Sequence, residues 1–116
     1  MVLDGDAKKL KIIVSEEGIV YQRSLYEAIL FAAKKYKIAG ATAHKGILSY
    51  GADDLANNAK AFSLPENMPV IIEMVDREER IYDFAEIVSK LIDKSGCGGI
   101  VYVESVDVVT YKKSVC

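Results

Sequence analysis

The sequence predicts a single α+β domain with a ferredoxin-like, split β-α-β (βαββαβ) sandwich fold, in which an antiparallel sheet carries two helices on one face. Three observations support this prediction. The chain has 116 residues, the size of one domain with one core. Strand-like and helix-like segments follow one another in the order β-α-β-β-α-β. No segment has the composition of a domain linker, so we treat residues 1–116 as one domain.

The first half of the chain contains the signals of a strand, a helix and a second strand. Residues 10–14 are apolar and β-branched, as in a buried strand. A helix should begin at Ser24, because Ser24 and Glu27 have the spacing of a capping box. Gly40 is expected to end this helix, and residues 41–50 to form the second strand. The apolar residues that recur at helical spacing here are Leu25, Ile29, Ala32, Ala33 and Tyr36.

The second half repeats the order of strand, helix and strand. Residues 69–75 (PVIIEMV) form the clearest strand of the chain, and residues 76–79 carry the acidic side chains that suit a helix N-terminus. We expect residues 96–99 to end this helix and residues 100–111 to form the last strand, with a bend or bulge near Glu104. The apolar stripe of the helix is Ile81, Phe84, Ala85, Val88, Leu91 and Ile92.

Apolar residues of the predicted strands point to both faces of the sheet. Val70, Ile72 and Met74 alternate with Ile71 and Val75, so this strand offers apolar side chains to each side. A sheet with one face in water alternates more cleanly between apolar and polar residues. Two helices cover only one face, and a large bare apolar patch is unusual on a monomer. We therefore expect the second face to be covered by further copies of the chain.

Charge and hydropathy exclude several classes of partner. The net charge is −2, and the basic residues come in short clusters such as the pairs at residues 8–9 and 112–113, which argues against a nucleic-acid partner. No stretch approaches the roughly 18 consecutive apolar residues that a membrane span needs, so we expect no direct membrane insertion. The first residues lack the order of charges and apolar residues found in a secretory signal, which favours a cytoplasmic location.

The sequence contains no recognisable catalytic or metal-binding motif. His44 is the single histidine, and Cys97 and Cys116 are the two cysteines, too few for a zinc site of usual spacing. The adjacent Asp53 and Asp54 are more typical of a solvated loop than of a metal site. Nucleophile-elbow and P-loop patterns are absent, so we do not predict an enzyme. The two cysteines are expected to be free thiols, with a redox clasp between them as the alternative.

Two charged residues lie inside predicted strands and need partners. Glu73 is surrounded by apolar residues, and a buried carboxylate is costly unless it is paired. Lys45 is a similar case, and an ion pair between subunits would satisfy both residues. We favour this structural role over catalysis, and we expect His44 to be a structural or interface residue rather than a ligand or base.

Several short motifs keep their order and spacing over nearly the whole chain, from Leu3 to Tyr111. They are Leu25-Tyr26-Glu27-Ala28-Ile29, Gly40-Ala41-Thr42, Lys45-Gly46-Ile47, Tyr50-Gly51-Ala52, Pro69-Val70-Ile71-Ile72-Glu73 and Val75-Asp76. In these motifs the chain resembles a family of small prokaryotic proteins related to the PII nitrogen-regulatory signal transducers. The resemblance implies the fold reached above, and a compact homotrimer with the open sheet faces turned inward.

The resemblance to PII proteins also implies a nucleotide site, because PII proteins bind adenine nucleotides in clefts between subunits. The implied ligand is AMP, ADP, ATP or a cyclic nucleotide. Exposed glycine amides can approach a phosphate without hindrance from a Cβ. The implied role is that of a regulator acting through the loop 51–68 on a partner such as a membrane transporter or a metabolic enzyme. The matching positions are Gly40, Ala41 and Thr42, then Lys45, Gly46 and Gly51, and finally Gly96, Cys97, Gly98 and Gly99.

The chain departs from the PII pattern at the phosphate end of this site. Ile100 follows Gly99 where PII proteins have a lysine, so a monophosphate, diphosphate or cyclic nucleotide fits as well as a triphosphate. Asn57 stands where the closer family has a histidine. Residues 96–99 also read as a simple helix stop and turn. Two other functions stay open: a ligand-free adaptor trimer that binds its partner constitutively, and an enzyme that uses Glu73 or His44 as acid or base.

Overall fold

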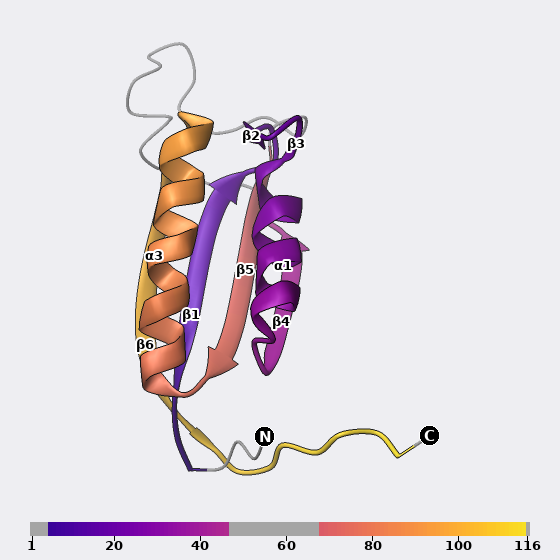
Figure 1. The fold of residues 1–116 in the computed structure, drawn as a ribbon, viewed down its shortest axis with the longest axis vertical. Helices are drawn as coiled ribbons and strands as arrows, with labels where there is room; N and C mark the ends of the chain where they lie inside the picture. The colour runs from indigo at the N-terminus through magenta and orange to yellow at the C-terminus, as the bar shows by residue number, and fades with distance from the viewer. Residues whose placement is uncertain (1–4, 47–67, 116) are drawn as a thin grey trace.

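The computed structural model describes residues 5–46 and 68–115, and it contains a layer of strands with a layer of two helices on one side (Figure 1). The sheet has the order β4-β5-β1-β6, and all neighbouring strands are antiparallel. This order confirms the predicted ferredoxin-like α+β fold with both helices on one face. The elements are β1 (Gly5–Ser15), β2 (Ile19–Val20), β3 (Arg23–Ser24), α1 (Leu25–Tyr36), β4 (Gly40–Lys45), β5 (Pro69–Asp76), α3 (Glu78–Ser95) and β6 (Gly99–Val108).

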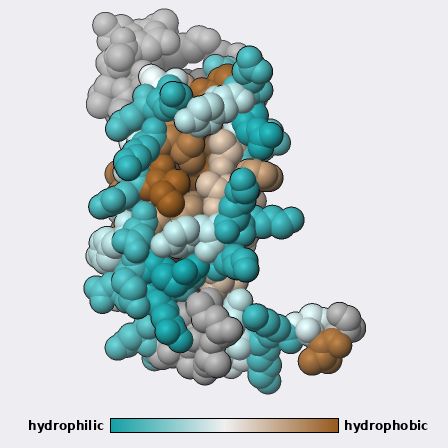
Figure 2. Space-filling model, in the orientation of Figure 1, coloured by the Kyte–Doolittle hydropathy of each residue, from teal (hydrophilic) through white to brown (hydrophobic). Residues whose placement is uncertain are grey.

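The core lies between the sheet and the two helices. Alternate residues of β1 and β5 point toward the helices, and the predicted apolar stripes of α1 and α3 point back toward the strands. Fully burying one such side chain contributes roughly 1.5–3 kcal/mol. Figure 2 shows that apolar side chains also remain visible between the two helices, bordered by hydrophilic ones. The largest fully buried apolar residues are Leu10, Ile12, Leu25, Ile29, Val70, Ile72, Met74, Ile81, Phe84 and Val88.

Helix α1 begins and ends differently in detail from the prediction. Ser24 is the N-cap residue as expected, but its side chain makes no capping hydrogen bond. Gly40 does not end the helix; it is the first residue of β4. The helix ends at Lys37, which adopts the left-handed conformation with φ 64°. Arg80 donates hydrogen bonds to the carbonyls of Tyr36 and Lys37, and these bonds satisfy the helix end without a glycine.

The outer strands also differ from their predicted bounds. The pairing of β1 with β6 runs without interruption from Val14 opposite Gly99 to Gly5 opposite Val108, so the predicted bulge near Glu104 is wrong. An ion pair between Lys9 and Glu104 (3.6 Å) holds the strands in register there. The expected strand over residues 41–50 is described only to Lys45. Most of the predicted loop 51–68, with Gly51, Asp53, Asp54 and Asn57, lies outside the described residues, as does Cys116.

The face of the sheet away from the helices is apolar only in part, which corrects the prediction of an oily second face. Ile13 is paired with Ile71 on one side and with Ile100 on the other, and Ile100 is 55% exposed. The rows beside these isoleucines are polar. Lys9 lies within 3.4 Å of Glu73 and also contacts Glu104. The prediction is right for the row of Ile13, Ile71 and Ile100 and wrong for the polar rows, because it considered β5 and β6 and neglected the lysines of β1.

A buried carboxylate joins the end of β5 to the connection between α1 and β4. The Asp76 side chain is fully buried and accepts hydrogen bonds from the amides of Ala39 (3.1 Å) and Arg77 (2.7 Å). It also accepts a charged hydrogen bond from Nε of Arg80 at 3.1 Å. The Tyr111 hydroxyl donates to the carbonyl of Ala39 at 2.8 Å. Together these bonds fix the backbone immediately before β4.

None of the helices in the described ranges is long and apolar enough to cross a membrane.

Replacing Asp76 by asparagine should destabilise the fold strongly. The amide group would turn NH₂ donors toward N–H groups and remove the charge that pairs with Arg80. We expect the free energy of unfolding to fall by about 2 to 3 kcal/mol, measured by denaturant titration. Asp83→Asn on the exposed side of α3 is the control and should change stability by less than about 0.5 kcal/mol. Equal stabilities of the two variants would contradict the structural role of Asp76.

Candidate functional site

The predicted site residues lie at opposite edges of the sheet. Gly40, Ala41 and Thr42 begin the edge strand β4, whereas residues 96–99 join α3 to the other edge strand, β6. Two strands, β5 and β1, lie between these edges. At about 4.8 Å per strand the edges are roughly 14 Å apart. One chain therefore does not bring the two halves of the predicted site together.

The predicted site residues also lie at different ends of the strands. Lys45 pairs with Val70, Val70 with Val14, and Val14 with Gly99, so Lys45 and Gly99 share one end of the sheet. Gly40 pairs with Val75, near the opposite end. Among the described residues of the predicted site, only the adjacent Lys45 and Gly46 lie beside the start of β5.

The positions of the predicted site have glycine for different physical reasons. Gly96 has φ 74° and ends α3, a conformation that favours glycine. A Cβ on Gly99 would lie 2.9 Å from Val14 Cγ1, so close packing against β1 requires glycine there. Gly40 has neither reason: a Cβ at this position meets no atom within 4 Å, and its φ is not positive. Among residues 5–46 and 68–115, no contact explains the absence of a side chain at Gly40.

The amides of the glycine loop are already engaged in part. The Gly96 N–H donates to the carbonyl of Asp93, and the Cys97 N–H donates to Oγ of Ser95 at 3.1 Å. The loop also follows the C-terminal end of α3, where the helix dipole is negative and disfavours an anion. The helix-stop interpretation therefore accounts for these two positions, and the phosphate-binding role stays a prediction. Cys97 is a half-buried free thiol.

Lys45 pairs with a residue that the sequence did not indicate. Its Nζ lies 2.9 Å from Oε2 of Glu16, in the turn after β1. The other oxygen of Glu16 accepts the N–H of Met68 at 3.0 Å. The hydrogen bond from the Met68 N–H is the main cause that lowers the pKa of the Glu16 carboxyl, and the Lys45 ammonium is the second. Glu16 in turn raises the pKa of Lys45. Glu73 pairs with a lysine as expected, but within the chain this lysine is Lys9. An ion pair between Lys45 and Glu73 of different subunits stays a prediction.

Backbone hydrogen bonds hold the same region together. The Gly46 N–H donates to the carbonyl of Pro69 at 2.8 Å, and the Glu16 N–H donates to the carbonyl of Met68 at 3.0 Å. We call residues 45–46 and 68–69 the loop feet, because the segment 47–67 begins and ends there. Glu16 contacts both feet. In the sequence, Glu16 stands beside a second glutamate, Glu17, in a polar turn, so no local pattern distinguishes it.

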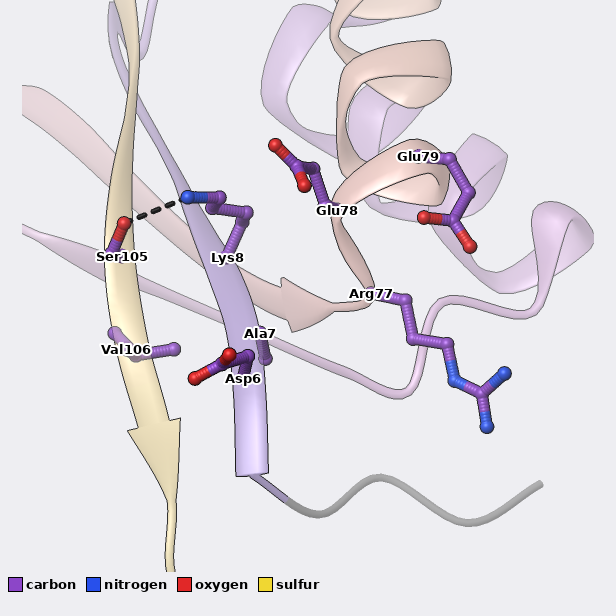
Figure 3. Close-up of a pocket in the computed structure, with 8 residues that line it drawn as sticks. All are labelled: Asp6, Ala7, Lys8, Arg77, Glu78, Glu79, Ser105 and Val106. Atoms are coloured by element: carbon purple, nitrogen blue, oxygen red, sulfur yellow. Dashed lines mark hydrogen bonds between the residues drawn. The ribbon is translucent and has the colours of Figure 1, made fainter.

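A hollow of about 610 Å³ lies at the other end of the molecule, between the start of α3 and the strands β1 and β6 (Figure 3). None of the predicted site residues line it. Lys8 of β1 donates to Oγ of Ser105 on the neighbouring strand β6 at 2.7 Å, whereas Arg77 points away from both strands. The three carboxylates outnumber the two cations, so the hollow is poorly suited to a phosphate. Its lining residues are Asp6, Ala7, Lys8, Arg77, Glu78, Glu79, Ser105 and Val106.

Comparison with known families decides the relationship of the chain. The model of the DUF190 family, described as "Uncharacterized ACR, COG1993", matches residues 7–108. The chain belongs to the DUF190 family. A UPF0166 protein of Aquifex aeolicus (strain VF5) is 31% identical over 102 residues, which cover 88% of this chain and 92% of the relative. Membership in DUF190 agrees with the predicted family of small proteins, and the PII-like solved structures described next confirm the predicted fold.

Solved structures share the fold of this DUF190 chain. The PII-like protein CPII from Thiomonas intermedia K12, bound to ADP, AMP and acetate, superposes with a TM-score of 0.65 at 17% identity, covering 91% of each chain. A candidate PII-like signaling protein from Thermus thermophilus gives 0.63 at 18% identity, covering 92% and 94%. A phage SAM lyase in complex with S-methyl-5'-thioadenosine gives 0.50 at 14% identity, covering 97% and 98%. The fold alone therefore does not separate regulators from enzymes.

Two glycine-to-alanine substitutions should show which glycine is required because its surroundings leave no room for a Cβ. A Cβ on Gly46 would lie 2.7 Å from Cγ of Pro69, so Gly46→Ala should push the loop feet apart and cost about 1 to 3 kcal/mol of stability. Gly40→Ala meets no atom and should change stability by less than about 0.5 kcal/mol. Thermal and denaturant unfolding of both variants measure the difference. If the two variants unfold alike, the close contact between Gly46 and Pro69 is not part of the native structure.

The contact of Glu16 predicts a dependence of stability on acid pH. A carboxyl whose pKa is lower in the folded state stabilises the fold above its unfolded pKa, here 4.5, and this contribution is lost as the pH falls through the folded value. Between about pH 7 and pH 3 the wild type should therefore lose more thermal stability than Glu16→Gln. Glu17→Gln, which removes the same charge from an exposed neighbour, should follow the wild type. Parallel pH curves for wild type and Glu16→Gln would contradict the contact.

Proposed function

We propose that this DUF190 protein is a PII-like regulatory protein, and not an enzyme, that binds a small adenine nucleotide in clefts between the subunits of a homotrimer. The proposed ligand-binding residues are those expected from the sequence, of which Gly51 lies outside the described range. They are Gly40, Ala41, Thr42, Lys45, Gly46, Gly51, Gly96, Cys97, Gly98 and Gly99.

The separation of the two sheet edges is the observation that carries this proposal. The parts of the site on β4 and beside β6 have two strands between them and cannot meet in one chain. They meet only where the β4 edge of one copy approaches the β6 side of another. Gly40 supports this arrangement, because it leaves space at the β4 edge that none of the described residues of its own chain fills. The ADP and AMP bound to CPII, which has the same fold, support an adenine nucleotide as the ligand.

The surfaces that the chain leaves open support self-association. β6 extends over ten residues and has no partner on its outer side among the described residues, and such edges readily pair with other chains. The row of Ile13, Ile71 and Ile100 forms an apolar strip on the face away from the helices. In the proposed trimer this strip is buried against the neighbouring subunits.

The proposed output acts through the loop 51–68. The nucleotide would change the fit of this loop to a target in the cytoplasm, for which a membrane transporter or a metabolic enzyme is our candidate. Such coupling requires that the nucleotide binds the two loop states with different affinities. Lys45 belongs to one of the loop feet, and Glu16 links it to Met68 in the other, so a ligand at Lys45 lies beside both loop feet.

One observation favours a second candidate function. The amides of Gly96 and Cys97 have partners within the chain, so the loop does not offer them to a phosphate in this conformation. This favours an adaptor trimer that binds its partner without a small ligand. Binding of a partner that is unchanged by nucleotide would support the adaptor.

Calorimetry with AMP, ADP, ATP and cyclic AMP tests the proposal directly. The wild type should bind at least one of them, and Gly40→Ala should weaken binding about tenfold, or by about 1.4 kcal/mol, because its Cβ enters the cleft. Its thermal stability should be unchanged. Ser89→Ala on the exposed side of α3 is the control and should bind like the wild type. No detectable heat with any of the four at millimolar concentration would exclude the nucleotide sensor.

A further inference from the structure

One cation lies among the described residues of the proposed cleft, and its charge is already paired. Of residues 40–42, 45–46 and 96–99, only Lys45 carries a positive side chain. Its ammonium is 2.9 Å from the carboxylate of Glu16. A phosphate that approaches Lys45 therefore meets a pair of opposite charges and not an isolated cation.

Glu16 is held in place more firmly than Lys45. The side chain of Glu16 is 17% exposed, whereas that of Lys45 is 61% exposed. Hydrogen bonds in both directions with the Met68 backbone fix Glu16: its Oε1 accepts the Met68 N–H, and its own N–H donates to the Met68 carbonyl. A ligand can therefore reorient the Lys45 side chain, but the negative charge of Glu16 stays close to any anion bound there.

The glycine loop offers no second cation in compensation. Ile100 directly follows the loop, and its side chain is 55% exposed. Lys94, in the last turn of α3, lies with its Nζ 5.2 Å above the ring of Tyr21. The phosphate chain of a triphosphate would thus extend from a neutral ion pair toward an apolar residue.

We propose that Glu16 is a specificity-determining residue of the nucleotide site: by neutralising Lys45 it makes the cleft favour nucleotides with one phosphate over ATP. This inference rests on the proposed function. The attraction of an unpaired Lys45 would grow with each negative charge of the ligand, whereas the attraction of the neutral pair hardly changes. Glu16 acts by its charge and by its position beside the loop feet, without having to touch the ligand.

The test compares AMP, ADP and ATP by calorimetry at low ionic strength. The buffer contains no magnesium, because a bound divalent ion would cancel the charge of the phosphates. The wild type should bind AMP at least as tightly as ATP. Glu16→Gln should bind AMP about twofold and ATP about tenfold more tightly, and added salt should reduce this gain. Glu17→Gln, which removes the same formal charge one residue away, should stay within about twofold of the wild type for all three ligands.

Lys45→Gln provides a second and independent arm, because its exposed side chain can be changed without disturbing the core. It leaves the charge of Glu16 unpaired, so binding of ATP should weaken about tenfold and binding of AMP about twofold. The double variant lacks both charges, so its site is neutral like the wild-type pair, and its affinities for ATP and AMP should return to near the wild-type values.

The outcomes separate this inference from the proposed function. If nucleotides bind and both variants change the affinity for AMP and ATP by the same factor, the selectivity role of Glu16 is overturned and the nucleotide site stands. If no nucleotide binds the wild type or either variant, both proposals fail. A wild type that prefers ATP over AMP overturns the inference as well.

Discussion

The pairing of β1 with both β5 and β6 is the constraint on which the rest of the structure depends. It places β1 inside the sheet, between β5 and β6, and sends β4 and β6 to opposite edges. The core closes around this arrangement without help from another chain. The proposed nucleotide cleft does not, because its parts lie on the two edges. The same pairing therefore gives one chain a stable fold and leaves its proposed site incomplete.

Ion pairs fix the backbone connections at both ends of the sheet. At one end of the sheet, Asp76 and Arg80 fix the connection into β4. At the other end, Glu16 joins Lys45 to the Met68 backbone and so joins the loop feet. In the first pair the Asp76 carboxylate is fully buried, and the pair stabilises the fold. In the second pair the Lys45 side chain is exposed, so an anion can reach its ammonium group. This difference in exposure is why we assign selectivity to Glu16 and a structural role to Asp76.

Local sequence patterns predicted the fold well because its main elements are periodic. The stripe of Ile81, Phe84 and Val88 is enough to identify α3 and its buried side. The errors arose where partners lie far apart in the sequence. Gly40 was assigned the end of α1, but Arg80, contributed by α3, stabilises Lys37 there instead.

The same limit applies to the candidate site. The motif that carries Lys45 was identified, but its partner Glu16 comes from a turn that no local pattern distinguishes, and only the strand order brings the two together. The glycines at 96 and 99 were noticed for phosphate binding, while the fold requires them for a helix end and for packing on Val14. Composition reveals that a glycine is present, but the reason for it depends on its neighbours in space.

Sedimentation velocity of the purified protein at micromolar concentration, with and without AMP, tests the central claim most directly. We expect a single species with three times the 12.8 kDa mass of one chain. A well-folded species of 12.8 kDa under both conditions would contradict it, because the two edges of the sheet would then have no neighbour with which to form a cleft.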